Sequence, residues 1–308
     1  SCDAFTLLGG TFTQATPATA DNRNYLLLAS VSNFTVRGCR LEYVGNGGIT
    51  VYAGSEDGTI EDVTVSNQSA FSTRRAIWLN GATASDYAEQ LVDTATVARN
   101  ATALPVYCVK RVSISRLRCS DVEYGVYLNN AHDCEIVSSH IDIGALGGRC
   151  IAGNNYCPGL RVSNNVISAS DAGTGVLVSQ AATGVVIADN IFRGTFAGGR
   201  AVYISYLAKA QVRGNHFSDN STQNIQVEMG GFAVIDSNAF LRAAKTANFN
   251  RAVYLVAIDA AQAGTTTGQS ATVLTDSGVV FTNNVIDKLP VAVLVDTSIA
   301  ASNGNQPG

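Results

Sequence analysis

The sequence is poor in charged residues and has no long apolar run. Charged side chains make up 14% of the 308 residues, and the formal net charge is −4. This weakly acidic balance argues against nucleic acid as the main partner. Because no apolar stretch is long enough to cross a bilayer, we expect no membrane insertion. No signal peptide is visible and the chain starts at Ser1 rather than Met, which indicates a processed or trimmed fragment.

Metal-binding motifs are missing as well. The chain has 7 cysteines and 3 histidines, but no Cys/His arrangement has the spacing of a zinc site. We therefore predict neither a metal nor a cofactor. Cys39 and Cys119 fall at positions predicted to face the core, where small apolar side chains are expected. Cys150 and Cys157 could form a disulfide if the protein is extracellular, and their spacing leaves this open.

What the sequence does contain is a repeat with a period in the low twenties. Asparagines recur at steps of 25, 25 and 23 residues, each followed two positions later by Ile or Phe. Short alternating strands and Gly/Ser/Asp-rich turns fill each period. Such a repeat predicts a β-solenoid, whose coils must stack to bury their apolar side chains. The paired positions are Asn165 and Ile167, Asn190 and Phe192, Asn215 and Phe217, and Asn238 and Phe240.

The repeat extends over nearly the whole chain, from Val36, Cys39 and Leu41 to Asn284 and Ile286. It resembles the repeat of right-handed parallel β-helix proteins, which include pectate-lyase-like enzymes and the polysaccharide-binding domains of phage tailspikes. The resemblance covers about residues 30–300. It implies an all-β, right-handed parallel β-helix of about ten coils. We interpret residues 1–308 as one domain, with an N-terminal cap over 1–30, and we expect the Asn column to form a ladder of stacked amides.

The resemblance is one of repeat and not of active-site motif. The sequence lacks an Asp-Asp pair, the Asn-Thr-Asp and Gly-His-Gly motifs of polygalacturonase-like hydrolases and the Asp-Pro-His motif of alginate epimerases. It also lacks a clustered set of Asp residues like the calcium site of pectate lyases. The divergent tailspike group is therefore the best resemblance. That group implies a bacterial surface polysaccharide as partner, a homotrimer, and an extracellular location, either secreted or on a virion tail.

Two coils are longer than their neighbours. The step from Ile77 to Ile114 takes 37 residues and that from Val253 to Val280 takes 27. The surplus lies at about 81–107 and 257–278, in both cases directly after the second strand of a coil. Long loops on a rigid scaffold usually carry function. At ~4.8 Å per coil the two loops stand roughly 25–30 Å apart, and we expect a site between them on the outer face of the second strands.

An arginine precedes the second strand on alternate coils, about 10 Å apart. Guanidinium forks recognise carboxylates, so this column suits an acidic polymer. Alternatively, each arginine pairs with a carboxylate in a turn, such as Glu123 or Asp219. The arginines are Arg75, Arg149, Arg200 and Arg251.

Aromatic side chains are predicted on the outer face of the same strands. Their rings offer flat faces to sugars and polar edges to hydroxyls, but they could equally be buried under the inserted loops or at a subunit interface. The aromatic residues are Trp78, Tyr127, Tyr203 and Tyr254. A polar column that suits hydroxyl recognition follows them: Asn80, Asn129, Asn154, Ser179, Ser205 and Glu228.

Acid–base groups near this face are few. Asp121 and Glu123 lie in the turn before the Tyr127 strand, and His132 and Asp133 lie in the turn after it. Hydrolysis needs two carboxylates about 5–9 Å apart, whereas a lyase needs a base such as His, Lys, Tyr or Arg near an acidic sugar. We predict Glu123 as the first acid–base group, with Asp133 or His132 as its partner.

The remaining candidates complete the predicted site. Asp121 and Glu228 are further acid–base candidates, and the predicted substrate-binding residues are Arg75, Trp78, Tyr127, Arg149, Arg200 and Tyr203. Two functional classes stay open. One is a depolymerase that binds and cleaves a bacterial capsule or O-antigen by hydrolysis or β-elimination. The other is a non-catalytic glycan-receptor-binding or structural β-helix.

Overall fold

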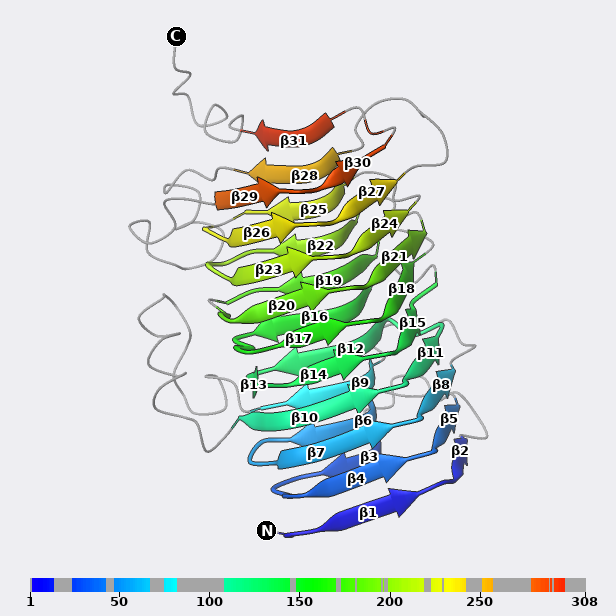
Figure 1. Cartoon of the computed structure of the whole chain (residues 1–308). Helices are drawn as coiled ribbons and strands as arrows, with labels where there is room; N and C mark the ends of the chain where they lie inside the picture. Colours follow the sequence, from blue (N-terminus) through cyan, green and yellow to red (C-terminus); the bar gives the residue numbers. More distant parts are fainter. Residues whose placement is uncertain are drawn as a thin grey trace, which may run out of the picture.

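A computed structural model shows a parallel β-helix (Figure 1). It describes residues 2–13, 24–42, 47–66, 75–81, 108–144, 148–169, 173–180, 182–194, 196, 199–218, 223–228, 230–241, 251–256, 278–287, 289 and 291–296. Within these ranges the chain forms strands and turns, and no helix that could span a membrane occurs. The all-β prediction is confirmed. Ten strands stack along the axis in each of two sheets, in line with the predicted coil number of about ten.

Each coil gives one strand to each of three sheets. The first sheet runs β1 (Phe5–Leu8), β4 (Phe34–Arg37), β7 (Glu56–Glu61), β10 (Val109–Ser115), β14 (Glu135–Val137), β17 (Arg161–Ser163), β20 (Val185–Ala188), β23 (Lys209–Arg213), β26 (Phe232–Asp236) and β29 (Gly278–Thr282), and β13 (Ala131–His132) pairs with β10 beside this path.

The second and third sheets complete the coils. The second runs β2 (Thr11–Thr13), β5 (Arg40–Glu42), β8 (Thr64–Ser66), β11 (Arg118–Ser120), β15 (His140–Asp142), β18 (Val166–Ala169), β21 (Ile191–Gly194), β24 (His216–Ser218), β27 (Ala239–Leu241) and β30 (Val285–Ile286). The third runs β3 (Asn24–Leu28), β6 (Gly47–Tyr52), β9 (Arg75–Asn80), β12 (Tyr124–Asn129), β16 (Arg149–Asn155), β19 (Thr174–Val178), β22 (Arg200–Ile204), β25 (Gln223–Val227), β28 (Arg251–Val256) and β31 (Val291–Asp296).

The interior is filled by columns of apolar side chains, because alternate residues of every strand point inward. Ile167, Phe192 and Phe217 are in register on successive strands of the second sheet and at most 1% exposed. The rings of Phe192 and Phe217 stack with centroids 4.8 Å apart, and Phe240 continues the stack at the same spacing. The predicted register of the repeat is therefore confirmed.

The Asn column forms the predicted ladder at the corner between the first and second sheets. The Nδ2 of Asn165 donates to the Oδ1 of Asn190 at 3.0 Å, and Asn190 donates in the same way to Asn215. Each amide also donates to a backbone carbonyl, as Asn190 does to Val162 at 2.9 Å. Asn238 and Asn284 extend the ladder. The ladder satisfies polar groups that would otherwise be buried without partners.

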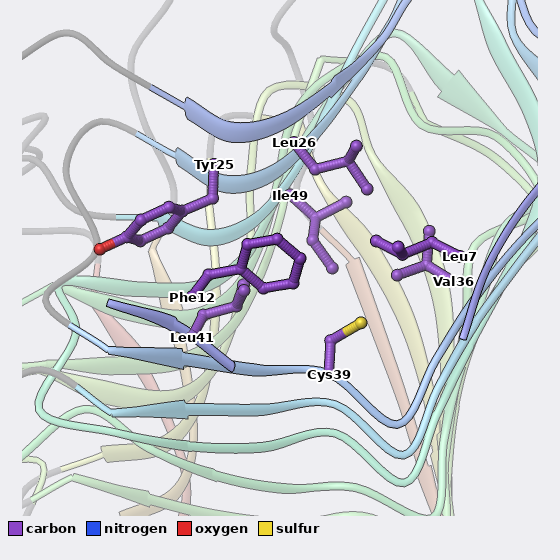
Figure 2. Close-up of a pocket in the computed structure, with 8 residues that line it drawn as sticks. All are labelled: Leu7, Phe12, Tyr25, Leu26, Val36, Cys39, Leu41 and Ile49. Carbon is purple, nitrogen blue, oxygen red and sulfur yellow. The ribbon is translucent and has the colours of Figure 1, made fainter. Parts of the chain in front are cut away.

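The sequence predicts an N-terminal cap over residues 1–30. The described part of this segment forms the first coil of the β-helix. Strands β1, β2 and β3 pair in parallel with β4, β5 and β6, so the described part of this segment continues the helix. Its side chains, among them Leu7, Phe12 and Leu26, meet inside the first coil (Figure 2). The space left between them is about 10 Å³, at most room for one water, and carries no ligand site.

All seven cysteines are thiols, and the possible disulfide between Cys150 and Cys157 is not formed. Cys39 and Cys119 are buried as predicted, at 2% and 4% exposure. Burial raises the pKa of the Cys119 thiol to about 12, which keeps it protonated and makes it an apolar core residue.

The two predicted loop insertions, 81–107 and 257–278, lie outside the described residues except at Gly81 and Gly278. The strands that precede them, β9 and β28, both belong to the third sheet. They are six strand steps apart in that sheet, which corresponds to about 29 Å. The site predicted between the two insertions would therefore lie on the outer face of the third sheet.

Candidate functional site

The outer face of the third sheet carries a continuous row of side chains. Parallel register aligns Trp78, Tyr127, Ala152, Leu177, Tyr203, Gln226 and Tyr254 on neighbouring strands. Alternation assigns all of them to the outer face, but Ala152, Leu177 and Gln226 are only 0%, 3% and 2% exposed. The large aromatic side chains are half-buried. Alternation therefore predicted the side of the sheet correctly but not the exposure.

The arginines lie on this face because of an irregularity at the start of the strands. In β9, Ala76 and Ile77 are both fully buried. Two consecutive inward residues leave Arg75 and Trp78 on the outer side of the same strand. The three-residue spacing then brings guanidinium and ring together. The same Arg-Ala-aliphatic-aromatic sequence recurs in β22 and β28.

Arg75 lies among three aromatic rings, and we call Arg75, Trp78, Tyr124 and Tyr127 the Arg75 cluster. Its guanidinium carbon is 4.3 Å from the centroid of Trp78, 4.7 Å from that of Tyr127 and 5.6 Å from that of Tyr124. The two tyrosine rings meet edge to face at 5.0 Å. Such cation–π contacts are worth about 0.5–2 kcal/mol each and hold a charge against an aromatic surface.

The Arg75 cluster is partly desolvated. Burial is the main cause that raises the pKa of Tyr124 and of Tyr127, while the positive charges of Arg75 and Arg149 oppose the shift. The buried indole N–H of Trp78 has no hydrogen-bond partner among the described residues. An unsatisfied buried donor costs free energy.

A second group surrounds Glu228, and we call Arg200, Tyr203, Gln226 and Glu228 the Glu228 cluster. The hydroxyl of Tyr203 donates to Oε1 of Glu228, and Nε2 of Gln226 donates to its Oε2. Arg200 donates through Nε to Oε1 of Gln226 and lies 4.7 Å from the ring of Tyr203. The carboxylate is thus fixed by donors from two adjacent strands and is 8% exposed.

The electrostatics of the Glu228 cluster define its protonation. Burial and then the negative charge of Glu228 raise the pKa of Tyr203, against the weaker opposing effect of Arg200. The phenol therefore keeps its proton at neutral pH. The cluster thus holds a carboxylate, a phenolic proton donor and a cation on one face.

The arginine column has two kinds of surroundings. Arg251 repeats the stacking contact, with its guanidinium 4.6 Å from the ring of Tyr254. Arg149 is followed on its strand by Ala152 and lies in register with Tyr124, between β12 and β19. The column therefore lies beside aromatic surface along much of the face.

The predicted acid–base residues around β12 are not brought together. Asp121 and Glu123 precede the strand, whereas His132 and Asp133 follow it. A strand of six residues is roughly 20 Å long, so Glu123 and Asp133 lie at opposite ends. Asp121 and Asp133 both occupy the left-handed backbone region, at φ 56° and 52°, as turn residues do.

His132 belongs to a different sheet from Tyr127. It lies on β13, which pairs with β10 of the first sheet. Its Nε2 lies 2.9 Å from Oδ1 of Asn130, and its ring contacts that of Tyr156 at 5.4 Å. Burial lowers the pKa of His132, against the opposing charge of Asp133. The histidine is therefore a half-buried corner residue.

The predicted polar column is largely buried. Asn80 and Asn129 are each 7% exposed, and Nδ2 of Asn129 donates to Oδ1 of Asn80 at 3.3 Å. A register shift between Leu128 and Asn129 pairs Asn129 with Asn155, so Asn154 does not belong to this column. Hydroxyl recognition by this column stays a prediction. Among its described members, Glu228 joins a cluster on the outer face.

Sequence reasoning missed Gln226 and Tyr124 as members of the clusters. In the sequence, Gln226 takes a position that other coils fill with an aromatic residue, and Tyr124 takes a position that other coils fill with an arginine. Among the described residues, no group of three or more His, Cys, Asp or Glu side chains is placed to hold a metal ion.

Comparison with solved structures shows the fold. The surface adhesin PfbA of Streptococcus pneumoniae is 14% identical with a TM-score of 0.54, over 87% of this chain and 63% of that one. The A-module of mannuronan C-5 epimerase AlgE4 from Azotobacter vinelandii is 14% identical with a TM-score of 0.55, over 95% of this chain and 89% of that one. The tailspike of Escherichia coli bacteriophage HK620, solved with a hexasaccharide, is 10% identical with a TM-score of 0.53, over 92% of this chain and 53% of that one.

The chain therefore spans less than two thirds of the adhesin and about half of the tailspike. A search among curated proteins found no match. A family model described as "Right handed beta helix region" matches residues 24–198 and 151–306. Since the two matches together cover most of the sequence, the chain belongs to the right-handed β-helix family.

Proposed function

We propose that this chain binds an acidic bacterial surface polysaccharide, a capsule or O-antigen, along the outer face of the third sheet and cleaves it at the Glu228 cluster. The observation that carries the proposal is the fixed carboxylate of Glu228, held by Tyr203 and Gln226 beside the cation Arg200. It combines a base, an acid and a carboxylate-binding group on one face.

Binding follows from the remaining side chains of that face. Arginines on alternate strands, about 10 Å apart, would take sugar carboxylates. The rings of Trp78, Tyr127 and Tyr203 would contact sugar faces. The names of three structural neighbours support a saccharide partner: a tailspike solved with a hexasaccharide, a mannuronan epimerase, and an alginate lyase of Paenibacillus that is 11% identical with a TM-score of 0.52, over 80% of this chain and 90% of that one.

The chemistry that this cluster suits best is β-elimination. Arg200 would neutralise the carboxylate of an acidic sugar, which makes the neighbouring C–H more acidic. Glu228 would accept that proton through a lone pair not used by its donors, and the electron pair would form a C=C bond as the glycosidic C–O bond breaks. Tyr203 would donate its proton to the leaving oxygen and regain one from Glu228 along their hydrogen bond.

Hydrolysis requires two carboxylates about 5–9 Å apart, which differs from the single carboxylate of the Glu228 cluster. Among the described residues, Glu228 is the carboxylate whose charge raises the pKa of Tyr203. The alternative acid–base set, Glu123 with Asp133 or His132, is divided by the length of β12. We therefore assign the proton transfers to Glu228 and Tyr203 and not to Glu123, Asp121, His132 or Asp133.

The test is a panel of purified bacterial capsules and O-antigens. New reducing ends together with the ultraviolet absorbance of an unsaturated sugar are the expected result. Reducing ends without that absorbance would indicate hydrolysis and overturn the elimination. Binding to a polysaccharide without cleavage would select the alternative, a non-catalytic receptor-binding β-helix.

We extend the proposal to the assembly and its location. A tailspike-like chain would form a homotrimer and act outside the cell, on a virion tail or as a secreted protein. Light scattering should give the mass of three chains. The mass of one chain would contradict the trimer for this fragment but leave the cleavage test unaffected.

A further inference from the structure

A groove follows the corner between the first and second sheets, away from the third sheet. It measures about 660 Å³ and crosses four successive coils, from Asp62 to Val166. A second hollow of about 220 Å³ on the outer face of the second sheet adjoins it and shares Thr64, Arg118 and His140. We call the two together the corner groove. Single left-handed residues turn each coil here, with φ of 53° at Asp62 and 57° at Asn164.

Two arginines of the corner groove differ in their partners. Arg116 is neutralised, because its Nη2 lies 2.6 Å from Glu61 and its Nε 2.5 Å from Asp62. Arg118 is exposed, and in the part of the chain that the structure describes no carboxylate lies within salt-bridge distance of it. The groove therefore contains one arginine that forms no ion pair with a described carboxylate.

Arg118 lies directly opposite His140 on the neighbouring strand. Adjacent strands are about 4.8 Å apart, so the two side chains can reach one small anion together. Two nitrogen donors in register over a hollow form the geometry in which a guanidinium fork and an imidazole grip a carboxylate.

The other side of the same surface offers hydrogen-bond acceptors. Asp142 lies two residues after His140 on β15, about 7 Å further along the strand. Its Oδ1 accepts a hydrogen bond from the Gly144 N–H at 2.9 Å, which orients the carboxylate. Ser120 lies beside it on β11, within the same hollow. Donors at one end and acceptors at the other match a sugar that carries a carboxylate and hydroxyls.

We propose that the corner groove is a second saccharide site, which takes the carboxylate of an acidic sugar on Arg118 and His140 and its hydroxyls on Asp142 and Ser120. The proposal is independent of the third sheet, because none of these residues belongs to the Arg75 or Glu228 clusters. A chain with both sites would hold one polymer at two places.

The test reads binding at His140 itself. The chain has 3 histidines, and diethyl pyrocarbonate modification of each is followed by peptide mass spectrometry. Sodium glucuronate is the probe, with glucose and sodium acetate as controls. At a glucuronate concentration about four times its Kd, modification of His140 should slow about fivefold. His132 and His216, outside the groove lining, should react at unchanged rates.

Two variants separate the groove from general charge effects. Arg118→Gln should abolish the protection of His140, whereas Arg161→Gln, an exposed arginine on β17, should retain it. Glu228→Gln should also retain it, which separates this result from the cleavage proposal. Absent protection, equal protection by acetate, or full protection in Arg118→Gln would each overturn the second site.

Discussion

The phenol of Tyr203 donates a hydrogen bond to the carboxylate of Glu228, one coil further along the helix. The bond joins the end of one strand to the aromatic row of its neighbour. Stacked coils provide such contacts at every step, and here the contact joins a proton donor to a proton acceptor. The reactivity of each group therefore depends on the other.

Replacing Glu228 by Gln should remove cleavage and keep binding. The amide cannot accept a proton from the sugar, and loss of an acid–base group lowers the rate by ~100-fold or more. Glu123→Gln is the matched control, since it makes the same change at the start of β12, and it should cleave normally. Depolymerisation would be measured by the release of unsaturated ends. Normal activity in Glu228→Gln would exclude the proposed base.

Replacing Arg200 by Lys should weaken the interaction with acidic polymers more than with neutral ones. Lysine keeps the charge but loses the planar fork and the stacking on Tyr203. We expect about a tenfold loss, or 1.4 kcal/mol, for a bidentate pair reduced to a point charge. Titration calorimetry with one acidic and one neutral polysaccharide measures it. Arg161→Lys on the first sheet is the control, and equal losses for both polymers would contradict the assignment.

Buried tyrosines should make the fold sensitive to alkali. Burial raises the pKa of Tyr203, with the charge of Glu228 as the second cause. An unfolded tyrosine loses its proton near pH 10. Above that pH the folded state binds more protons than the unfolded state, so stability falls as pH rises.

Urea unfolding between neutral pH and pH ~11 would measure this effect. Tyr203→Phe should flatten the decline, whereas Tyr52→Phe, at a residue 41% exposed, should not. An unchanged pH profile in Tyr203→Phe would show that its ionisation does not contribute.

Removing one rung of the Asn ladder should destabilise the helix. Asn190 donates to Val162 and to Asn215, and its Oδ1 accepts from both nitrogens of Asn165. Asn190→Ala leaves buried partners unsatisfied, at a cost of about 1–3 kcal/mol for each lost group. Asn164→Gly, which keeps the left-handed turn next to the ladder, should cost much less. Similar unfolding midpoints for the two variants would disprove the stabilising role.

Phe217→Ala should create a cavity in the aromatic stack. Its ring lies between Phe192 and Phe240, 4.8 Å from each. Truncation of a buried Phe typically costs about 3–5 kcal/mol. Phe232→Ala, at a residue 36% exposed on β26, is the matched control. Equal effects of the two changes would contradict the packing described here.

The interior of this fold was predictable because stacking forces equivalent residues to the same position. Asn190 must follow Asn165 after one coil to bond to it, and Phe192 must follow Ile167 to stack. Both pairs of residues therefore recur in the sequence at the spacing of one coil. The first coil lacked this signal, since Gly9 and Gly10, with positive φ of 71° and 117°, turn its corner without an Asn.

The Glu228 cluster was only partly predictable. Its members were visible one by one, but the contact of Tyr203 with Glu228 depends on side-chain reach between coils, which periodicity does not encode. The shift that pairs Asn129 with Asn155 was likewise hidden, because a bulge changes the register without changing residue types. The acid–base prediction around Glu123 placed its partners across β12, and the length of that strand keeps the two turns apart.

The Asn ladder runs only from Asn165 onward. At the same corner, the earlier coils place Val63 and Leu117, at 1% and 0% exposure, and then Ser139, whose backbone N–H donates to Asn165. At this corner the helix therefore has two parts that meet at Ser139. Dispersion contacts hold the coils before Ser139, and the Asn ladder holds the coils after it. Under tension along the helix axis, the coils with an apolar corner should unfold one at a time, whereas the coils of the Asn ladder should resist and then unfold together.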